Sequence, residues 1–154
     1  MCMELEKSSH CRYKIRYHLV WGVKYGHEIL FGDRITHLKY IVMEIGSRYD
    51  FNIEAVGTDI NHVHVFAGAH PAISPASIVQ VIKSISAKEM FKKYPDIKKF
   101  LWGGSLWSIG YFIRTVSDGP LEKVVKKYVE NQGKVWKQDE DNDEFTQLEL
   151  KLVP

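Results

Sequence analysis

A short run of alternating side chains, residues 62–69, constrains the fold of this chain more than any other segment. Its odd-numbered positions hold only valine and alanine, whereas its even-numbered positions begin with His62 and His64 and continue with phenylalanine and glycine. Successive residues of a β-strand point to opposite faces of a sheet, so this spacing predicts a strand. One face of the strand suits a core covered by helices, and the other presents two imidazoles.

The other periodic segments give this strand a place in an ordered set of elements. Asp33 is a plausible N-cap for one amphipathic helix, and Ser74-Pro75 is a typical opening for a second. In chain order we expect a strand over 11–23, a helix over 33–50, strands over 52–58 and 62–69 joined by a turn at 59–61, a helix over 74–94, a strand over 107–116 and a helix over 120–132. This order predicts an α+β fold with a ferredoxin-like β-α-β-β-α-β core, an antiparallel sheet with helices on one face, and a further C-terminal helix.

Length and charge set the class of partner. The 154 residues predict one domain over 1–137, followed by an acidic tail over 138–154. The net charge of +2 divides into +7 for the body and −5 for the tail. A basic body favours a polyanion such as nucleic acid, although a charge of this size is also consistent with solubility alone.

The sequence also bears on the compartment. Cys2 and Cys11 lack the spacing of metal ligands, and no apolar run has the length of a signal-peptide core or of a bilayer span. We therefore expect a cytoplasmic protein, associated with the nucleoid when it is on DNA, with no membrane partner.

Two pairs of polar side chains could carry chemistry. His62 and His64 share a strand face, and Tyr128 and Gln132 are four residues apart on one face of the last predicted helix. Two imidazoles and an amide oxygen could hold a divalent metal that polarises a phosphodiester, and a tyrosine phenolate beside them could attack the phosphorus. The alternatives are two strand histidines that bind nothing and a tyrosine that belongs to the core.

The combination of these segments resembles a known family. His62-Val63-His64 resembles the His-hydrophobic-His motif of the single-tyrosine "HUH" transposases of insertion sequences of the 200/605 type, and Lys126 to Gln132 resembles their tyrosine helix. Tyr17 to Trp21, followed by Lys24-Tyr25, is similar to their first strand. The chain differs from the family at Gly26-His27, where the family often has a basic pair.

The resemblance implies an RRM-like or ferredoxin-like domain that acts as a homodimer. Tyr128 would be the catalytic nucleophile, forming a 5′-phosphotyrosine on single-stranded DNA, and His62, His64 and Gln132 would be the metal ligands. The substrate would carry imperfect hairpins near the element ends. A divalent metal, Mg²⁺ or Mn²⁺, would be the only cofactor, so no nucleotide cofactor is expected.

Contacts to DNA are open to a second interpretation. Basic side chains on a predicted strand face and a predicted helix flank could contact phosphates, or could simply be solvated. They are Arg12, Lys14, Arg16, Lys83, Lys88 and Lys92. Trp102 or Trp107 could stack on unpaired bases, or could belong to the core.

Three other functions deserve comparison with the transposase. A domesticated relative would use the same chemistry on repeats elsewhere in a genome. A non-catalytic RRM-like module would bind single strands without cleaving them, but the stacking aromatics of the usual RRM signature are not evident. A two-histidine phosphoesterase needs two separated His-x-Ser/Thr motifs, which the chain does not have.

Overall fold

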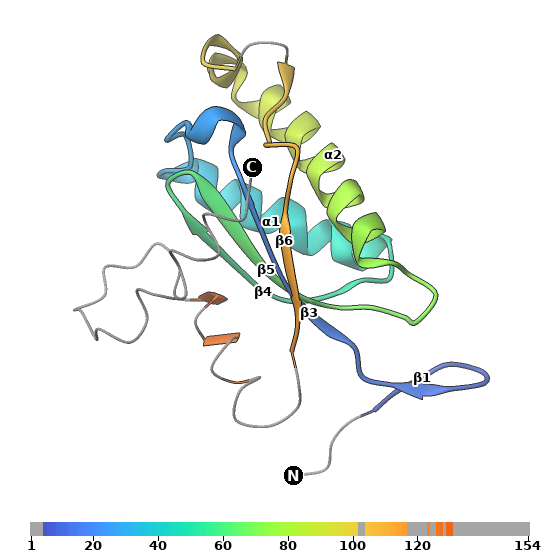
Figure 1. Ribbon diagram of the computed structural model, residues 1–154. Coiled ribbons are helices and arrows are strands. Elements are labelled where there is room, and N and C mark those ends of the chain that lie inside the picture. Colours follow the sequence, from blue (N-terminus) through green and yellow to red (C-terminus); the bar gives the residue numbers. More distant parts are fainter. Residues whose placement is uncertain (1–4, 102–103, 117–122, 124–125, 128, 131–154) are drawn as a thin grey trace, which may run out of the picture.

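A four-stranded sheet and two helices form the body of the protein in the computed structural model, which describes residues 5–101, 104–116, 123, 126–127 and 129–130. The strands β4 (Asn52–Asp59), β5 (His62–Gly68), β3 (Arg16–Gly22) and β6 (Phe112–Thr115) are neighbours in that order, and every pair is antiparallel. The helices α1 (Asp33–Arg48) and α2 (Pro75–Lys93) lie on one side of the sheet (Figure 1). The chain order β3-α1-β4-β5-α2-β6 confirms the predicted core.

The first predicted strand, 11–23, is wrong as a single element. Its first part pairs instead in a small ribbon, β1 (Glu6–Lys7) with β2 (Arg12–Tyr13), and β3 begins only at Arg16. Beyond β3 the chain turns into a short 3₁₀ helix, η1 (Lys24–Gly26). A second 3₁₀ helix, η2 (Pro95–Lys99), follows α2.

The last predicted strand, 107–116, is also shorter than expected. Only Phe112–Thr115 pairs with β3, and Trp107 forms an isolated bridge with Val23. The carbonyls of the intervening residues, 108–110, accept hydrogen bonds from Lys83 Nζ. Because these carbonyls face a side chain of α2, they do not join the ladder.

The helix ends follow the local sequence with one difference. Ser74 caps α2 as predicted, since its Oγ accepts from the Ser77 amide at 3.1 Å, and Pro75 occupies the first turn. Asp33, in contrast, is the first residue of α1, and the cap position is Gly32 with φ of 58°. A positive φ suits glycine, which explains why the aspartate begins one residue inside the helix.

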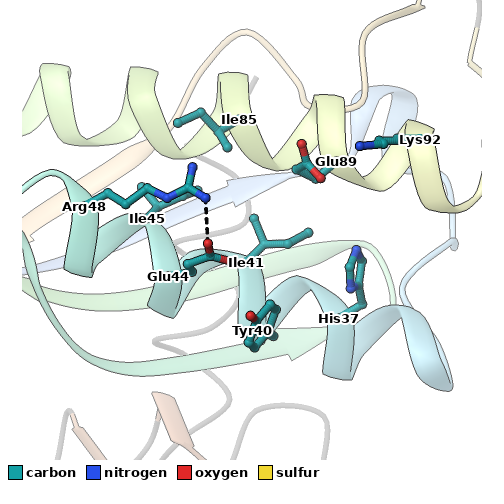
Figure 2. Close-up of a pocket in the computed structure, with 9 residues that line it drawn as sticks. All are labelled: His37, Tyr40, Ile41, Glu44, Ile45, Arg48, Ile85, Glu89 and Lys92. Atoms are coloured by element: carbon teal, nitrogen blue, oxygen red, sulfur yellow. Dashed lines mark hydrogen bonds and ion pairs between the residues drawn. The ribbon is translucent and has the colours of Figure 1, made fainter.

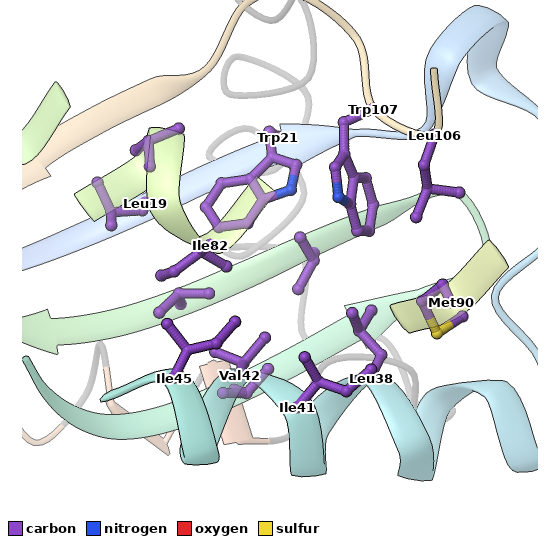
Figure 3. Packing of buried hydrophobic residues seen from close by; sticks show 14 of the residues in the cluster. Leu19, Trp21, Leu38, Ile41, Val42, Ile45, Ile82, Met90, Leu106 and Trp107 are labelled. Carbon is purple, nitrogen blue, oxygen red and sulfur yellow. The ribbon is translucent and has the colours of Figure 1, made fainter. Parts of the chain in front are cut away.

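The main core lies between the sheet and the two helices. Figure 3 shows Leu19 and Trp21 of β3 facing Leu38, Val42 and Ile45 of α1. The predicted apolar face of β5 belongs to the same cluster, which includes Val63, Val65, Ala67 and Ala69. The alternating pattern of 62–69 therefore divides its two faces as the sequence predicts.

Trp107 belongs to this core. Its ring packs edge-on against Trp21 at 6.1 Å between centroids, and its Nε1 donates to Ser86 Oγ at 2.9 Å. With 6% of its surface exposed, Trp107 is not available to stack on bases. Trp102 lies outside the described residues.

The opposite face of the sheet carries a smaller apolar cluster. It consists of Ala55, Phe66, Val116 and Val129, all of them buried. The described residues of the last predicted helix, which include Val129, are helical. Val129 therefore brings this helix against the histidine-bearing face, while Tyr128, Gln132 and the acidic tail lie outside the described residues.

In the part of the chain that the structure describes, no helix is both long and apolar enough to cross a membrane.

Candidate active site

Three histidines meet on the sheet face that is turned away from α1 and α2. His62 and His64 come from β5, and His18 comes from the neighbouring β3. Their rings form a row, with centroids 5.0 Å apart between His62 and His64 and 5.3 Å apart between His64 and His18. All three side chains are buried.

The neighbouring strands place a glycine opposite each of the predicted ligands. In the sheet register, His62 lies opposite Gly22 of β3, and His64 lies opposite Gly57 of β4. Glycine inside a strand carries no side chain and often marks a point where a ligand approaches closely. Each imidazole thus has one cross-strand neighbour without a side chain.

Hydrogen bonds fix the orientation of two of the rings. His62 Nδ1 lies 2.8 Å from Asn61 Oδ1, which can only accept, so Nδ1 carries the proton and Nε2 keeps its lone pair. His62 Nε2 is buried and has no hydrogen-bond partner among the described residues. A buried imidazole nitrogen whose partner atom is already oriented by a side chain suits a metal ion.

His18 provides the corresponding contact for His64. Its Nε2 lies 3.0 Å from His64 Nδ1, with both rings buried. If His64 Nδ1 carries the proton, His18 Nε2 accepts it, and His64 Nε2 then presents a lone pair as well. A second side chain therefore contacts Nδ1 of each predicted ligand.

The surroundings keep all three imidazoles neutral. Burial lowers the pKa of His18 to about 4, with a further contribution from the charge of Arg114. Burial also lowers the pKa of His62, against the opposing effect of Asp59, and it lowers the pKa of His64 well below the ordinary value. Neutral imidazole is the form that binds metal ions.

The described residues could supply two ligands to a metal ion, His62 and His64. Among the described residues, no group of three or more His, Cys, Asp or Glu side chains is placed to hold a metal ion. His62 and His64 fit such an ion as a pair, and a further ligand has to come from elsewhere. The amide oxygen of Gln132 has suitable chemistry.

Sequence reasoning missed the role of His18. The strand predicted over 11–23 offers basic side chains for DNA, and His18 is not among the predicted site residues. The missing step was the topology: in the ferredoxin-like plan the first and third strands are neighbours. A histidine facing away from the core on the first strand therefore meets those of the His-x-His strand.

The predicted DNA contacts are in different environments. Arg16 is buried and forms ion pairs with Glu54 and Glu6, so its expected position on an open basic face is wrong. Lys83 Nζ already donates to three backbone carbonyls, and burial lowers its pKa to about 8. Arg12, Lys88 and Lys92 are exposed and Lys14 is partly buried. The DNA contacts of all six remain predictions.

A groove on the helical side of the molecule is separate from the histidines. It lies between α1 and α2 and has a volume of about 320 Å³. Acidic and basic side chains line it, including the ion pair of Glu44 and Arg48 (Figure 2). Since the helices cover the face of the sheet opposite to the histidines, this groove is not part of the candidate site.

Comparison with known proteins agrees with the fold. Residues 11–132 match the model of the family described as "Transposase IS200 like". The chain is 35% identical over 130 residues to the ISDra2 transposase TnpA of Deinococcus radiodurans, covering 84% of this chain and 92% of that protein. It is 23% identical over 128 residues to the transposase of insertion sequence element IS200 of Salmonella typhimurium, covering 82% of this chain and 83% of that protein.

Solved structures show the same architecture. A crystal structure of a protein from Deinococcus radiodurans R1, assigned as a transposase, superposes with a TM-score of 0.69 at 32% identity, covering 84% of this chain and 99% of that one. A REP-associated tyrosine transposase bound to a REP hairpin superposes with a TM-score of 0.53 at 13% identity, covering 80% of this chain and 70% of that one. The second likeness concerns the fold alone.

The fold defines an α+β domain of the transposase type, with paired histidines on the sheet face opposite α1 and α2. The chain belongs to the IS200-like transposase family.

Proposed function

We propose that this protein cleaves and rejoins single-stranded DNA at the ends of an insertion sequence through a 5′-phosphotyrosine on Tyr128. His62, His64 and Gln132 would hold a divalent metal, Mg²⁺ or Mn²⁺. The observation that carries the proposal is the pair of buried, neutral imidazoles on β5, each oriented by a hydrogen bond from behind. Val129, the residue after Tyr128 in the sequence, is buried in the apolar cluster on the same sheet face, which supports the proposal.

In the proposed reaction, the Tyr128 oxygen attacks the phosphorus of the scissile phosphodiester. The bond from phosphorus to the 3′-oxygen breaks, that oxygen takes up a proton, and the 5′-phosphate stays on the tyrosine. A 3′-hydroxyl from another strand end reverses the step, so the bond energy is kept and no nucleotide cofactor is needed. When bound, the metal would polarise the phosphodiester and offset its developing charge.

Two side chains prepare the ligands for this role. Asn61 Oδ1 accepts from His62 Nδ1, and His18 Nε2, 3.0 Å from His64 Nδ1, would accept the proton of that nitrogen, so that Nε2 of both imidazoles would keep its lone pair for the metal. Fixing the ring orientation in advance lowers the cost of organising the site when metal and DNA arrive. Asn61 and His18 are therefore positioning residues in this scheme.

The partners follow from the same proposal. The substrate would be single-stranded DNA that carries imperfect hairpins, and the working unit would be a homodimer. The REP-associated relative is described as bound to a REP hairpin, which supports hairpin binding in this fold. The sign of the body charge, +7 over residues 1–137, suits a phosphate backbone.

The test is a covalent adduct. A labelled hairpin oligonucleotide from the flanks of the source gene would be incubated with protein and Mg²⁺ or Mn²⁺ and run on a denaturing protein gel. We expect an adduct with the wild type and with Tyr40→Phe, an exposed tyrosine on α1, and none with Tyr128→Phe or in EDTA. An adduct at wild-type level in Tyr128→Phe would refute the assigned nucleophile.

The same gel separates the alternatives. Tight hairpin binding without any adduct, across a panel of flanking sequences, would indicate a non-catalytic binding module. An adduct formed only with repeats found elsewhere in the genome would indicate a domesticated relative. His62→Ala should remove the adduct while leaving hairpin binding, because it removes a proposed metal ligand and no positive charge.

A further inference from the structure

Large aromatic side chains are exposed just beyond the end of β3. Tyr25, Phe31 and Phe100 have 68%, 53% and 54% of their surfaces exposed. The ring of His27 lies between two of them, 6.1 Å from Tyr25 and 6.5 Å from Phe100 between centroids. We call these four residues the aromatic surface. Several exposed rings in one place are typical of a binding site.

The aromatic surface borders a preformed hollow. His27, Phe31 and Phe100 line a space of about 430 Å³ together with Arg34 and Asp96. Arg34 holds its walls together, because it pairs with Asp96 of η2, donates to the Ile29 carbonyl at 3.1 Å, and lies 4.6 Å over the Phe31 ring. Arg34 thus connects three of the segments around the hollow.

The backbone also holds one ring outward. Tyr25 has φ of 61° and ψ of 14°, a left-handed conformation that is uncommon for a residue with a bulky side chain. Such backbone strain persists where the surrounding structure enforces it, and it often accompanies a functional role. Here it accompanies the most exposed of the four rings.

The segment that carries these rings is bonded to the turn before His62. The Val23 amide donates to the Asn61 carbonyl at 2.8 Å, and the Leu30 amide donates to the Ile60 carbonyl at 2.9 Å. Asn61 in turn orients His62 through its side chain. The aromatic surface and His62 therefore lie at the same end of the sheet, and hydrogen bonds of the 59–61 turn connect them.

The charges around the hollow are mixed. Lys24 Nζ lies 5.2 Å over the Tyr25 ring, and Lys98 and Lys99 are exposed on η2. Glu28 lines the same hollow and opposes them. A phosphate backbone would gain a modest attraction here, so stacking on the rings has to supply most of the affinity.

We propose that the aromatic surface stacks the unpaired bases that flank the phosphodiester to be cleaved. This inference rests on the proposed function, since it takes single-stranded DNA as the substrate. A duplex buries the faces of its bases, so only an unpaired segment can offer them to Tyr25 and Phe100. The aromatic surface would then distinguish the unpaired flank from the paired stem of a hairpin.

The experiment uses the full chain and two substitutions, Tyr25→Ala and Phe100→Ala. The probe is a short oligothymidylate with one 2-aminopurine, whose fluorescence falls when the base stacks on a ring. Titrations are run in EDTA, so that no cleavage occurs, with the same oligonucleotide in a full duplex for comparison. Tyr40→Ala is the matched control, because Tyr40 is 64% exposed but lies on α1.

The wild type and Tyr40→Ala should quench the single-stranded probe and not the duplex. Each of the two substitutions should weaken binding by about fivefold to 100-fold, the loss expected for one stacked base. Circular dichroism of each variant checks that the fold is kept. Equal affinity and equal quenching in wild type, Tyr25→Ala and Phe100→Ala would overturn the proposal.

The outcomes for the two proposals can be told apart. If the wild type forms the covalent adduct but the two substitutions leave probe binding intact, base stacking on the aromatic surface is refuted and the proposed cleavage reaction stands. If no adduct forms but probe binding depends on both rings, base stacking on the aromatic surface stands and the proposed cleavage reaction is refuted. If sedimentation shows that the substitutions dissociate a dimer while probe affinity stays the same, the aromatic surface binds a second copy of the chain, which also overturns the proposal.

Discussion

The buried histidines predict that the metal-free protein loses stability as the pH falls from neutral. Burial holds the pKa of His18 near 4 in the folded protein, whereas an unfolded chain restores an ordinary value near 6.5. Between these two values the unfolded state binds a proton that the folded state does not. Stability therefore rises with pH across this window and is lost as the pH falls through it.

The size of the effect follows from the same values. The gap between about 6.5 and about 4, at about 1.4 kcal/mol per pKa unit, corresponds to about 3 kcal/mol from His18. The pKa values of His62 and His64 are lowered in the same direction and add to the loss. A domain of ordinary stability, about 5 to 15 kcal/mol, would lose a substantial part of it.

Urea unfolding in EDTA, measured at intervals between pH 7 and pH 4, tests this reasoning. His18→Gln should flatten the dependence by about 1 kcal/mol per pH unit near pH 5, because it removes one titrating imidazole. His10→Gln, which changes an exposed histidine, should leave the wild-type slope. A free energy of unfolding that stays constant from pH 6.5 to 4.5, or that falls equally in His18→Gln, would refute the argument.

Three further predictions concern single contacts. His18→Phe removes the proposed acceptor for His64 Nδ1, so the affinity for Mn²⁺ without DNA should fall by about ten- to 100-fold in calorimetry. His18→Gln should recover part of this affinity. An unchanged affinity in His18→Phe contradicts the positioning role of His18. Ser86→Ala leaves the buried Trp107 N–H without its acceptor and should cost about 1 to 3 kcal/mol in urea unfolding, a loss that Ser86→Thr should reduce if its hydroxyl reaches the same place. Lys83→Met removes the donor shared by three carbonyls, so amides in residues 108–110 should exchange faster in hydrogen-exchange experiments, and unchanged protection there would count against the contact.

The core topology was predictable because the periodic patterns are local and strong. The alternation of 62–69 assigned both faces of β5, and Ser74-Pro75 marked the start of α2. The strand boundaries were less accurate where a distant side chain competes for the backbone. The carbonyls of 108–110 bind Lys83 of α2, a contact that no pattern within 107–116 reveals.

The site was predictable in part for the same reason. His62 and His64 share a face because they are two residues apart, which the sequence shows directly. The contributions of His18 and Asn61 depend on how strands and turns meet in space. Arg16 was placed on an open face because its ion pairs with Glu6 and Glu54 come from two other strands.

The turn at residues 59–61 has a consequence for where a DNA strand is cut. The Asn61 carbonyl accepts a hydrogen bond from the Val23 amide, at the start of the segment that leads to the aromatic surface. The Asn61 side chain accepts a hydrogen bond from His62. Hydrogen bonds of this one turn thus connect the aromatic surface to His62. A base held on the rings and a phosphate held at the histidines would then be separated by a constant number of nucleotides. In that case the turn would fix the distance along the strand between the bound base and the phosphodiester that is cleaved.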